Sequence, residues 1–240
     1  MIPTEPSPAA SADRLTFASW LGGLCIAAAF SLVLPMAVLF WWSVAHAGLG
    51  PLAFPHSPVM TVLLPVLGEA AMVLGAWLVL RRRLPLYSFG LHRLTLTDLW
   101  FALGFFAWNL AVWLGVSNLL DVQALPAQVQ QARLWAQTWW AIPAIALAAG
   151  VCEEIMFRGY LLLGLVKLKP NLAWLWLLLS TGLFAVGHVD WGISRLSQMI
   201  PFLAFGLAAG LIVLRTRRLY PVIIGHFIWD AFVPVFLLHR

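Results

Sequence analysis

Charged side chains are scarce in this chain of 240 residues. They make up 10% of the sequence, whereas a soluble domain averages roughly 25%. Apolar residues account for 62%, and a water-soluble fold of this size has too little interior to bury that many. Lipid has to cover the excess. The shortage of charge therefore excludes an ordinary soluble domain and predicts an integral, multi-pass membrane protein.

The sequence is also poor in cysteine. Its two thiols, Cys25 and Cys152, stand alone in apolar runs and form neither a disulfide framework nor a CxxC pair. The net charge of +5 does not point to nucleic acid, because the basic residues fall in short segments between apolar runs, where they set membrane topology. We therefore expect no nucleic-acid partner and expect contact with the lipid bilayer.

Long apolar runs are what the sequence does have. A helix needs about 20 apolar residues to cross a bilayer, and barrel strands would alternate over roughly 10 residues. The runs are long and continuous, so the predicted fold class is all-α, a polytopic transmembrane helix bundle with about seven spanning helices. They cover residues 17–44, 59–80, 96–119, 139–165, 172–189, 197–214 and 219–238.

The basic residues orient this bundle. With the N-terminus inside, ten Lys and Arg residues fall in inside segments and three in outside segments, which favours that orientation.

Residues 1–16 are polar and rich in Pro, Ser and Ala, which predicts a disordered tail. Residues 17–135 would then form the N-terminal transmembrane helices, and residues 136–238 the remaining core helices.

Few ionisable residues lie inside the apolar runs. A charge at the centre of the bilayer costs about 2.5–3.5 kcal/mol even on the lenient scale, so such residues usually face the bundle interior and serve a function. A buried pair that only orders helix packing is the alternative. The residues concerned are Glu69, Glu153, Glu154, Arg158, His188, His226 and Asp230.

The stretch GVCEEIMFRGY holds three of them. Glu154 and Arg158 are four apart, in the order that favours pairing on one face of a helix. Glu153 would point about 100° away from Glu154 on an α-helix. It is left as the unpaired carboxylate, which is what a general base requires. We interpret Glu69, in an earlier run, as a secondary polar contact.

Two histidine motifs follow. His188 comes four residues after Phe184, and Asp230 four residues after His226. Each pair could serve helix packing or catalysis. Two histidines and a glutamate are also zinc ligands, but the chain has no HExxH sequence. Counted at about 1.5 Å per residue from the expected helix ends, His188 lies roughly 24 Å from the inner face and His226 roughly 10 Å.

Three motifs, EExxxR, FxxxH and HxxxD, thus occur in this order. Their residues are Glu153, Glu154, Arg158, Phe184, His188, His226 and Asp230. Together they resemble the motifs of the CPBP family, also called the ABI or CAAX-protease-and-bacteriocin-processing family, whose best-known members are the type II CAAX prenyl endopeptidases. The resemblance covers roughly residues 139–235 and implies that residues 136–238 are a catalytic core.

The resemblance implies an intramembrane glutamic endopeptidase that needs no metal or cofactor. In this family the first glutamate and the second motif's histidine activate a water, which assigns Glu153 and His188. The third motif forms the oxyanion site, here His226 and Asp230. Supporting roles would fall to Glu154, Arg158 and Phe184. The substrate would be a membrane-associated peptide or protein, and we expect the chain in a bacterial inner membrane.

Asp230 departs from eukaryotic relatives, which carry Asn at this position. An ionised aspartate cannot donate a hydrogen bond, so Asp230 is either protonated or orients His226 as a charged donor.

Three other functions remain as alternatives. A non-catalytic scaffold, immunity or regulatory protein would use the polar cluster for recognition, a zinc protease would depend on metal, and a proton-coupled transporter would show paired repeats with broken helices, which the sequence lacks.

Overall fold

The structure is a computed structural model that describes residues 15–45, 58–91, 93–119, 126–188 and 196–238. The tail predicted to be disordered, residues 1–16, lies almost wholly outside these ranges. The long elements are α2 (Phe17–Ala45), α3 (Pro58–Leu80), α4 (Leu96–Leu119), α5 (Pro126–Ala136), α6 (Ala141–Ala148), the π-helix η4 (Ala149–Leu163), α7 (Gly164–Leu168), α8 (Ala173–Val186), α9 (Ile200–Thr216) and α10 (Tyr220–Leu238). Short 3₁₀ turns cover Leu86–Phe89 (η3), Pro170–Leu172 (η5) and Leu196–Met199 (η7).

The predicted all-α fold class is confirmed, because the described residues form helices and no strand. Every predicted apolar run contains a helix. Among the described residues, four helices are long and apolar enough to cross a membrane, namely Phe17–Trp41, Val59–Leu80, Leu96–Leu119 and Ser197–Thr216. Pro170–Val186 and Tyr220–Phe236 are shorter apolar helices. Large apolar side chains on the outside, such as Leu32 and Phe40, face where lipid would lie. The chain is an integral membrane protein.

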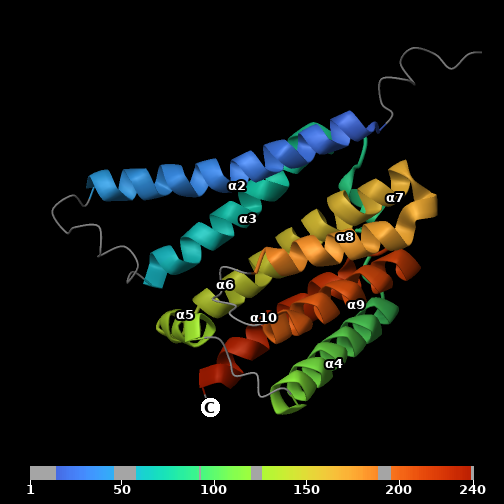
Figure 1. Cartoon of the computed structure of the whole chain (residues 1–240). Helices are drawn as coiled ribbons and strands as arrows, with labels where there is room; N and C mark the ends of the chain where they lie inside the picture. Colours follow the sequence, from blue (N-terminus) through green and yellow to red (C-terminus); the bar gives the residue numbers. More distant parts are fainter. Residues whose placement is uncertain (1–14, 46–57, 92, 120–125, 189–195, 239–240) are drawn as a thin grey trace, which may run out of the picture.

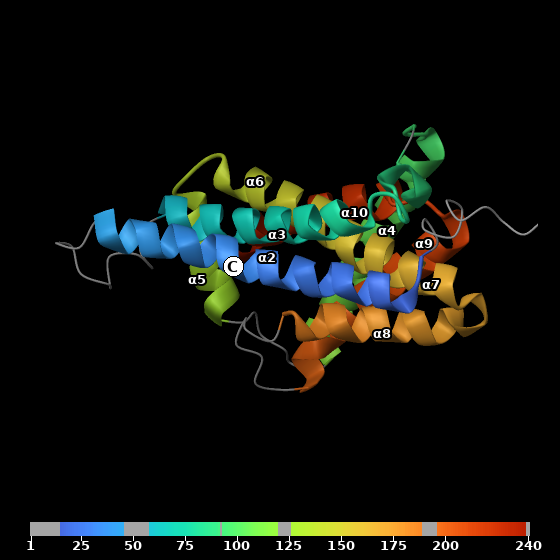
Figure 2. The same cartoon turned by 90° about the horizontal axis from the view of Figure 1, so that it is seen from above.

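The π-helix η4 lies at the centre of the bundle. It continues α6 and leads into α7, and it packs against α3, α8, α9 and α10. Figure 1 and Figure 2 show α2 paired along α3 on one side of it, with α4, α9 and α10 on the other. The EExxxR motif therefore lies in the interior of the protein, within reach of side chains from several helices.

Glycines allow these helices to approach one another closely. A Cβ at Gly206 would lie 3.1 Å from Cγ2 of Thr181, so this glycine lets α9 pack closely on α8. A Cβ at Gly225 would lie 2.6 Å from Cδ1 of Phe105 and 3.0 Å from the carbonyl oxygen of Ala102. Gly225 thereby brings α10 against α4, one residue before His226.

An ion pair ties the turn between α9 and α10 to the start of α4. Arg218 donates from Nε and Nη2 to the two carboxylate oxygens of Asp98, both at 2.7 Å, and also to the carbonyl oxygen of Arg93. Asp98 in turn caps α4 with Thr95, since Oδ2 accepts from the Thr95 backbone N–H at 2.7 Å. The Asp98 carboxylate raises the pKa of Arg218. This clamp fixes the helix that carries the HxxxD motif.

One helix was not expected from the sequence. α5 spans Pro126–Ala136 between the third and fourth apolar runs, and its polar and apolar residues nearly balance. It packs against α3, α6 and α10. Because its apolar content is far below that of a spanning segment, a search for apolar runs passes over it.

Candidate active site

The EExxxR motif lies on a π-helix and not on an α-helix. All residues from Ala149 to Leu163 are in π-helical conformation, which is rare and often marks functional sites. The angle of about 100° between Glu153 and Glu154, which assumes an α-helix, is therefore wrong, because i→i+5 hydrogen bonding widens each turn. Gly150 is the second residue of this segment, and a Cβ there would lie 3.0 Å from the carbonyl oxygen of Ile223 on α10.

Glu154 is fully buried and binds two partners through one oxygen. Its Oε1 accepts a hydrogen bond from Nη1 of Arg158 at 3.0 Å, which confirms the pair predicted from their spacing. The same Oε1 lies 2.8 Å from Nδ1 of His226 on α10. The second contact was not predicted, and it joins the first motif to the third.

Arg158 is also buried, with 1% of its surface exposed. Its guanidinium carbon lies 4.2 Å from the ring centroid of Phe184 and 5.8 Å from that of Phe205. Its Nε and Nη2 atoms have no hydrogen-bond partner. Cation–π contacts with these rings replace part of the stabilisation that the guanidinium would receive from water. Phe184 thus covers the buried guanidinium of Arg158.

His188 follows the last turn of α8, and its ring orientation is set locally. Its Nδ1 lies 2.8 Å from the carbonyl oxygen of Phe184. A carbonyl oxygen only accepts, so Nδ1 carries the hydrogen, and in the neutral ring Nε2 is then the acceptor. The ring centroid lies 4.7 Å from that of Phe184 and 4.6 Å from that of Phe202.

His226 uses both ring nitrogens within the site. Nδ1 faces Glu154, and Nε2 lies 3.3 Å from Oδ2 of Asp230 on the next turn of α10. Both partners are carboxyl groups. With both carboxylates ionised, the ring can donate to both only as an imidazolium. The ring is 3% exposed, and its centroid lies 4.6 Å from that of Phe205.

The two histidines both lie close to one phenylalanine, Phe184. The ring centroid of Phe184 is 4.7 Å from that of His188 and 6.2 Å from that of His226. The difference in depth obtained by counting along the helices, roughly 24 Å against roughly 10 Å, is therefore wrong. Such a count holds only for helices that begin at one depth and run parallel, and α8 and α10 do not satisfy both conditions.

Glu153 stands at the meeting point of these groups. It interacts electrostatically with His188, His226 and Asp230 as well as with neighbouring Glu154. Its Oε2 is buried and has no hydrogen-bond partner. Within the described ranges, no three His, Cys, Asp or Glu side chains are placed so that they could hold one metal ion. The arrangement is instead a buried carboxylate beside two imidazoles.

Sequence reasoning undervalued one member of the cluster. Glu69 on α3 interacts electrostatically with Glu153, Asp230 and His226. Its Oε2 is also buried and without a hydrogen-bond partner. The signal was present, since Glu69 is a carboxylate inside an apolar run. The sequence did not indicate which helix α3 would pack against, so it could not place Glu69 beside the motifs.

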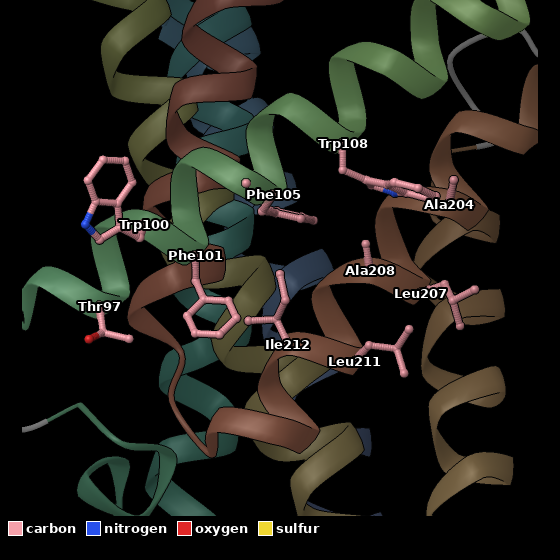
Figure 3. A pocket seen from close by; sticks show the side chains of 11 residues that line it. Thr97, Trp100, Phe101, Phe105, Trp108, Ala204, Leu207, Ala208, Leu211 and Ile212 are labelled. Carbon is pink, nitrogen blue, oxygen red and sulfur yellow. The ribbon is translucent and has the colours of Figure 1, made fainter.

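An apolar groove lies outside this cluster, between α4 and α9. It has a volume of about 570 Å³. Figure 3 shows Trp100, Phe101 and Trp108 of α4 at this groove, opposite Ala208 and Ile212 of α9.

The groove and the cluster are separated by two aromatic rings. Phe105 lines the groove, its ring centroid lies 4.8 Å from that of Phe205, and Phe205 in turn contacts His226. The groove itself contains no acid, base or nucleophile beyond the hydroxyl of Thr97. It therefore contributes no catalytic group.

Comparison with known proteins agrees with the motifs. Residues 135–232 match the family model described as type II CAAX prenyl endopeptidase Rce1-like. No curated protein and no solved structure matches the chain. The matched residues include η4, the end of α8 and most of α10, which together carry EExxxR, FxxxH and HxxxD. Residues 135–232 are therefore similar to type II CAAX prenyl endopeptidases of the Rce1-like kind.

Proposed function

We propose that this protein is an intramembrane glutamic endopeptidase, in which Glu153 and His188 activate a water that attacks a peptide bond. The observation that carries the proposal is that Glu153 on η4, His188 just after α8, and His226 and Asp230 on α10 lie close to one another. Peptide hydrolysis needs a base for the water and a donor where negative charge develops. This cluster offers both.

The base side of the reaction falls to Glu153 and His188. The Oε2 atom of Glu153 makes no hydrogen bond within the protein, so it is available to accept the proton of a water. The hydrogen bond of His188 to the Phe184 carbonyl leaves Nε2 as an acceptor in the neutral ring. Both groups can thus orient one water, and the proton taken by Glu153 would later pass to the leaving amine.

Stabilisation of the oxyanion falls to His226 and Asp230. Glu154 and Asp230 hold the His226 ring from its two nitrogens. The ring can stabilise an oxyanion when the substrate carbonyl replaces Asp230 at Nε2, and the partly exposed Asp230 side chain, with 28% of its surface accessible, is the partner that is free to move. Glu154 and Arg158 would keep the ring in place during this exchange.

The substrate class follows from where the site lies. The acidic and histidine side chains are inside a bundle of apolar helices, so a substrate has to reach them from the membrane. We infer a membrane-associated peptide or protein, cut by the core at residues 136–238, with residues 17–135 forming the surrounding helices. We place the chain in the inner membrane of a bacterial cell with the N-terminus inside, as the distribution of Lys and Arg favours.

The test is cleavage of a panel of membrane-anchored peptides by the purified protein in detergent. Wild type is compared with Glu153→Gln, with an EDTA-treated sample, and with Glu5→Gln as a matched control outside the described residues. The proposal expects cleavage that survives EDTA and Glu5→Gln but is lost in Glu153→Gln. Cleavage by Glu153→Gln at the wild-type rate would remove Glu153 as the base, and loss of cleavage with EDTA alone would favour a zinc protease.

A further inference from the structure

Glu69 belongs to the polar cluster although no motif includes it. The described part of the chain has five acidic residues. Asp98 lies in the clamp with Arg218, and the other four, Glu69 among them, interact with one another or with His226. α3 brings Glu69 to this position by packing against η4 and α6. A helix outside the matched family domain thus contributes a carboxyl group to the site.

The surroundings of Glu69 contain little positive charge. α2 and α6, which pack on α3, contain no Asp, Glu, Lys, Arg or His. η4 contributes Cys152 and Glu153 together with the mutually paired Glu154 and Arg158. α10 contributes His226 and Asp230. α5 carries one charged residue, Arg133, and it is exposed.

The one cationic candidate near Glu69 in these elements is already engaged. His226 faces Glu154 through Nδ1 and Asp230 through Nε2. Glu69 and Glu153 therefore lie near each other in an apolar interior, each with a buried Oε2 that has no hydrogen-bond partner. Ionisation of one of two neighbouring carboxyl groups in such a place disfavours ionisation of the other, so one of them keeps a proton.

Resting on the function proposed above, we propose that Glu69 is a positioning residue of the hydrolytic site that carries the proton shared with Glu153, and so keeps Glu153 ionised as the base. The two carboxyl groups are not equivalent, because Glu153 also faces the two histidines and Glu69 faces only His226. The negative charge is therefore better stabilised on Glu153. The proton consequently resides on Glu69.

This role has a consequence for the pH dependence of hydrolysis. When the pH rises until Glu69 ionises, a second negative charge appears beside Glu153 and beside the oxyanion that forms in the transition state. The rate should then fall. In Glu69→Gln the side chain is neutral at every pH, so the alkaline limb of the profile should move to higher pH by about one pH unit or more, as expected for strongly coupled sites.

The first experiment is infrared spectroscopy of the purified full-length protein in detergent, which requires no substrate. Wild type at neutral pH should show the C=O stretch of a protonated carboxylic acid. Glu69→Gln should lose this band, Glu5→Gln should keep it, and Glu69→Asp should keep it at a shifted frequency because residue 69 itself carries the proton. Absence of the band in wild type, its persistence in Glu69→Gln, or an unshifted band in Glu69→Asp would each overturn the proposal.

The second experiment measures kcat and KM against pH for wild type and Glu69→Gln. A purely structural contact would lower both profiles uniformly, whereas the proposal expects the alkaline limb of kcat to shift while KM does not. Superimposable profiles would contradict it. If Glu153→Gln hydrolyses as well as wild type, the proposed function fails, but the infrared result still decides whether Glu69 carries a proton.

Discussion

Glu154 and His226 lie 72 positions apart in the chain, yet Oε1 of Glu154 lies 2.8 Å from Nδ1 of His226. The same oxygen accepts a hydrogen bond from Arg158 at 3.0 Å. Because Glu154 is completely buried, the two contacts replace the water that its carboxylate has lost. One oxygen atom therefore joins the EExxxR motif on η4 to the HxxxD motif on α10.

Replacing Glu154 with glutamine tests this junction. The amide has the size of the carboxylate but no charge, so Arg158 would be left buried without its counter-ion. Breaking a buried pair in this way costs about 3–5 kcal/mol. We expect a clearly lower unfolding temperature in detergent and loss of hydrolysis, while Glu5→Gln behaves like wild type. A Glu154→Gln protein as stable as wild type would show that the pair does not hold the core.

Arg158→Lys tests the aromatic contacts of the guanidinium. Lysine keeps the charge and can still reach Glu154, but it has no flat surface to lay on Phe184. The contact at 4.2 Å should be worth about 1–2 kcal/mol in a site without water, and thermal unfolding would measure its loss. The matched control is Arg81→Lys, because Arg81 lies 4.9 Å from the Trp77 ring on the exposed surface. Equal effects of the two changes would argue against a buried cation–π contact.

Asp230 can be tested by two substitutions that differ in hydrogen bonding. Asp230→Ala removes the carboxyl group 3.3 Å from Nε2 of His226 and should lower kcat by up to about 10²–10³, the loss expected when an oxyanion donor, here His226, is no longer held in place. Asp230→Asn should cost less, because an amide can donate to the developing oxyanion. Steady-state rates on the same peptide would compare the variants. Equal loss in both would mean that the negative charge of Asp230, and not hydrogen bonding, is what the site needs.

The sequence predicted the helices and the composition of the site better than its geometry. Each apolar run became a helix because a lipid-facing segment must satisfy its backbone internally, and the spacing of Glu154 and Arg158 was enough to predict their pair. The π-helix was not predictable, since it depends on how η4 packs between α3 and α10 and not on its own residues. The contact of Glu154 with His226 has the same origin.

Glu69 and α5 were undervalued for related reasons. Glu69 was visible as a carboxylate inside an apolar run, but its neighbours are set by long-range packing of α3 on η4, which periodicity does not encode. α5 has too little apolar content to be found as a spanning segment. The difference in depth between His188 and His226 failed because it took helix length as a measure of position in the membrane.

Gly150→Ala tests whether the close approach of η4 and α10 maintains the site. A Cβ at residue 150 would lie 3.0 Å from the Ile223 carbonyl oxygen and 3.0 Å from the Phe227 backbone nitrogen, and backbone cannot move aside as a flexible side chain can. We expect α10 to shift, with lower thermal stability and reduced hydrolysis, because His226 lies between these two contacts.

Gly182→Ala is the matched control, since a Cβ there meets nothing within 4 Å. On helix propensity alone it should stabilise α8 by up to about 1 kcal/mol. Thermal unfolding and peptide cleavage would be measured for both variants. If Gly150→Ala is as stable and as active as Gly182→Ala, the spacing between η4 and α10 is not what keeps Glu154 and His226 together, and the clamp between Arg218 and Asp98 becomes the better explanation.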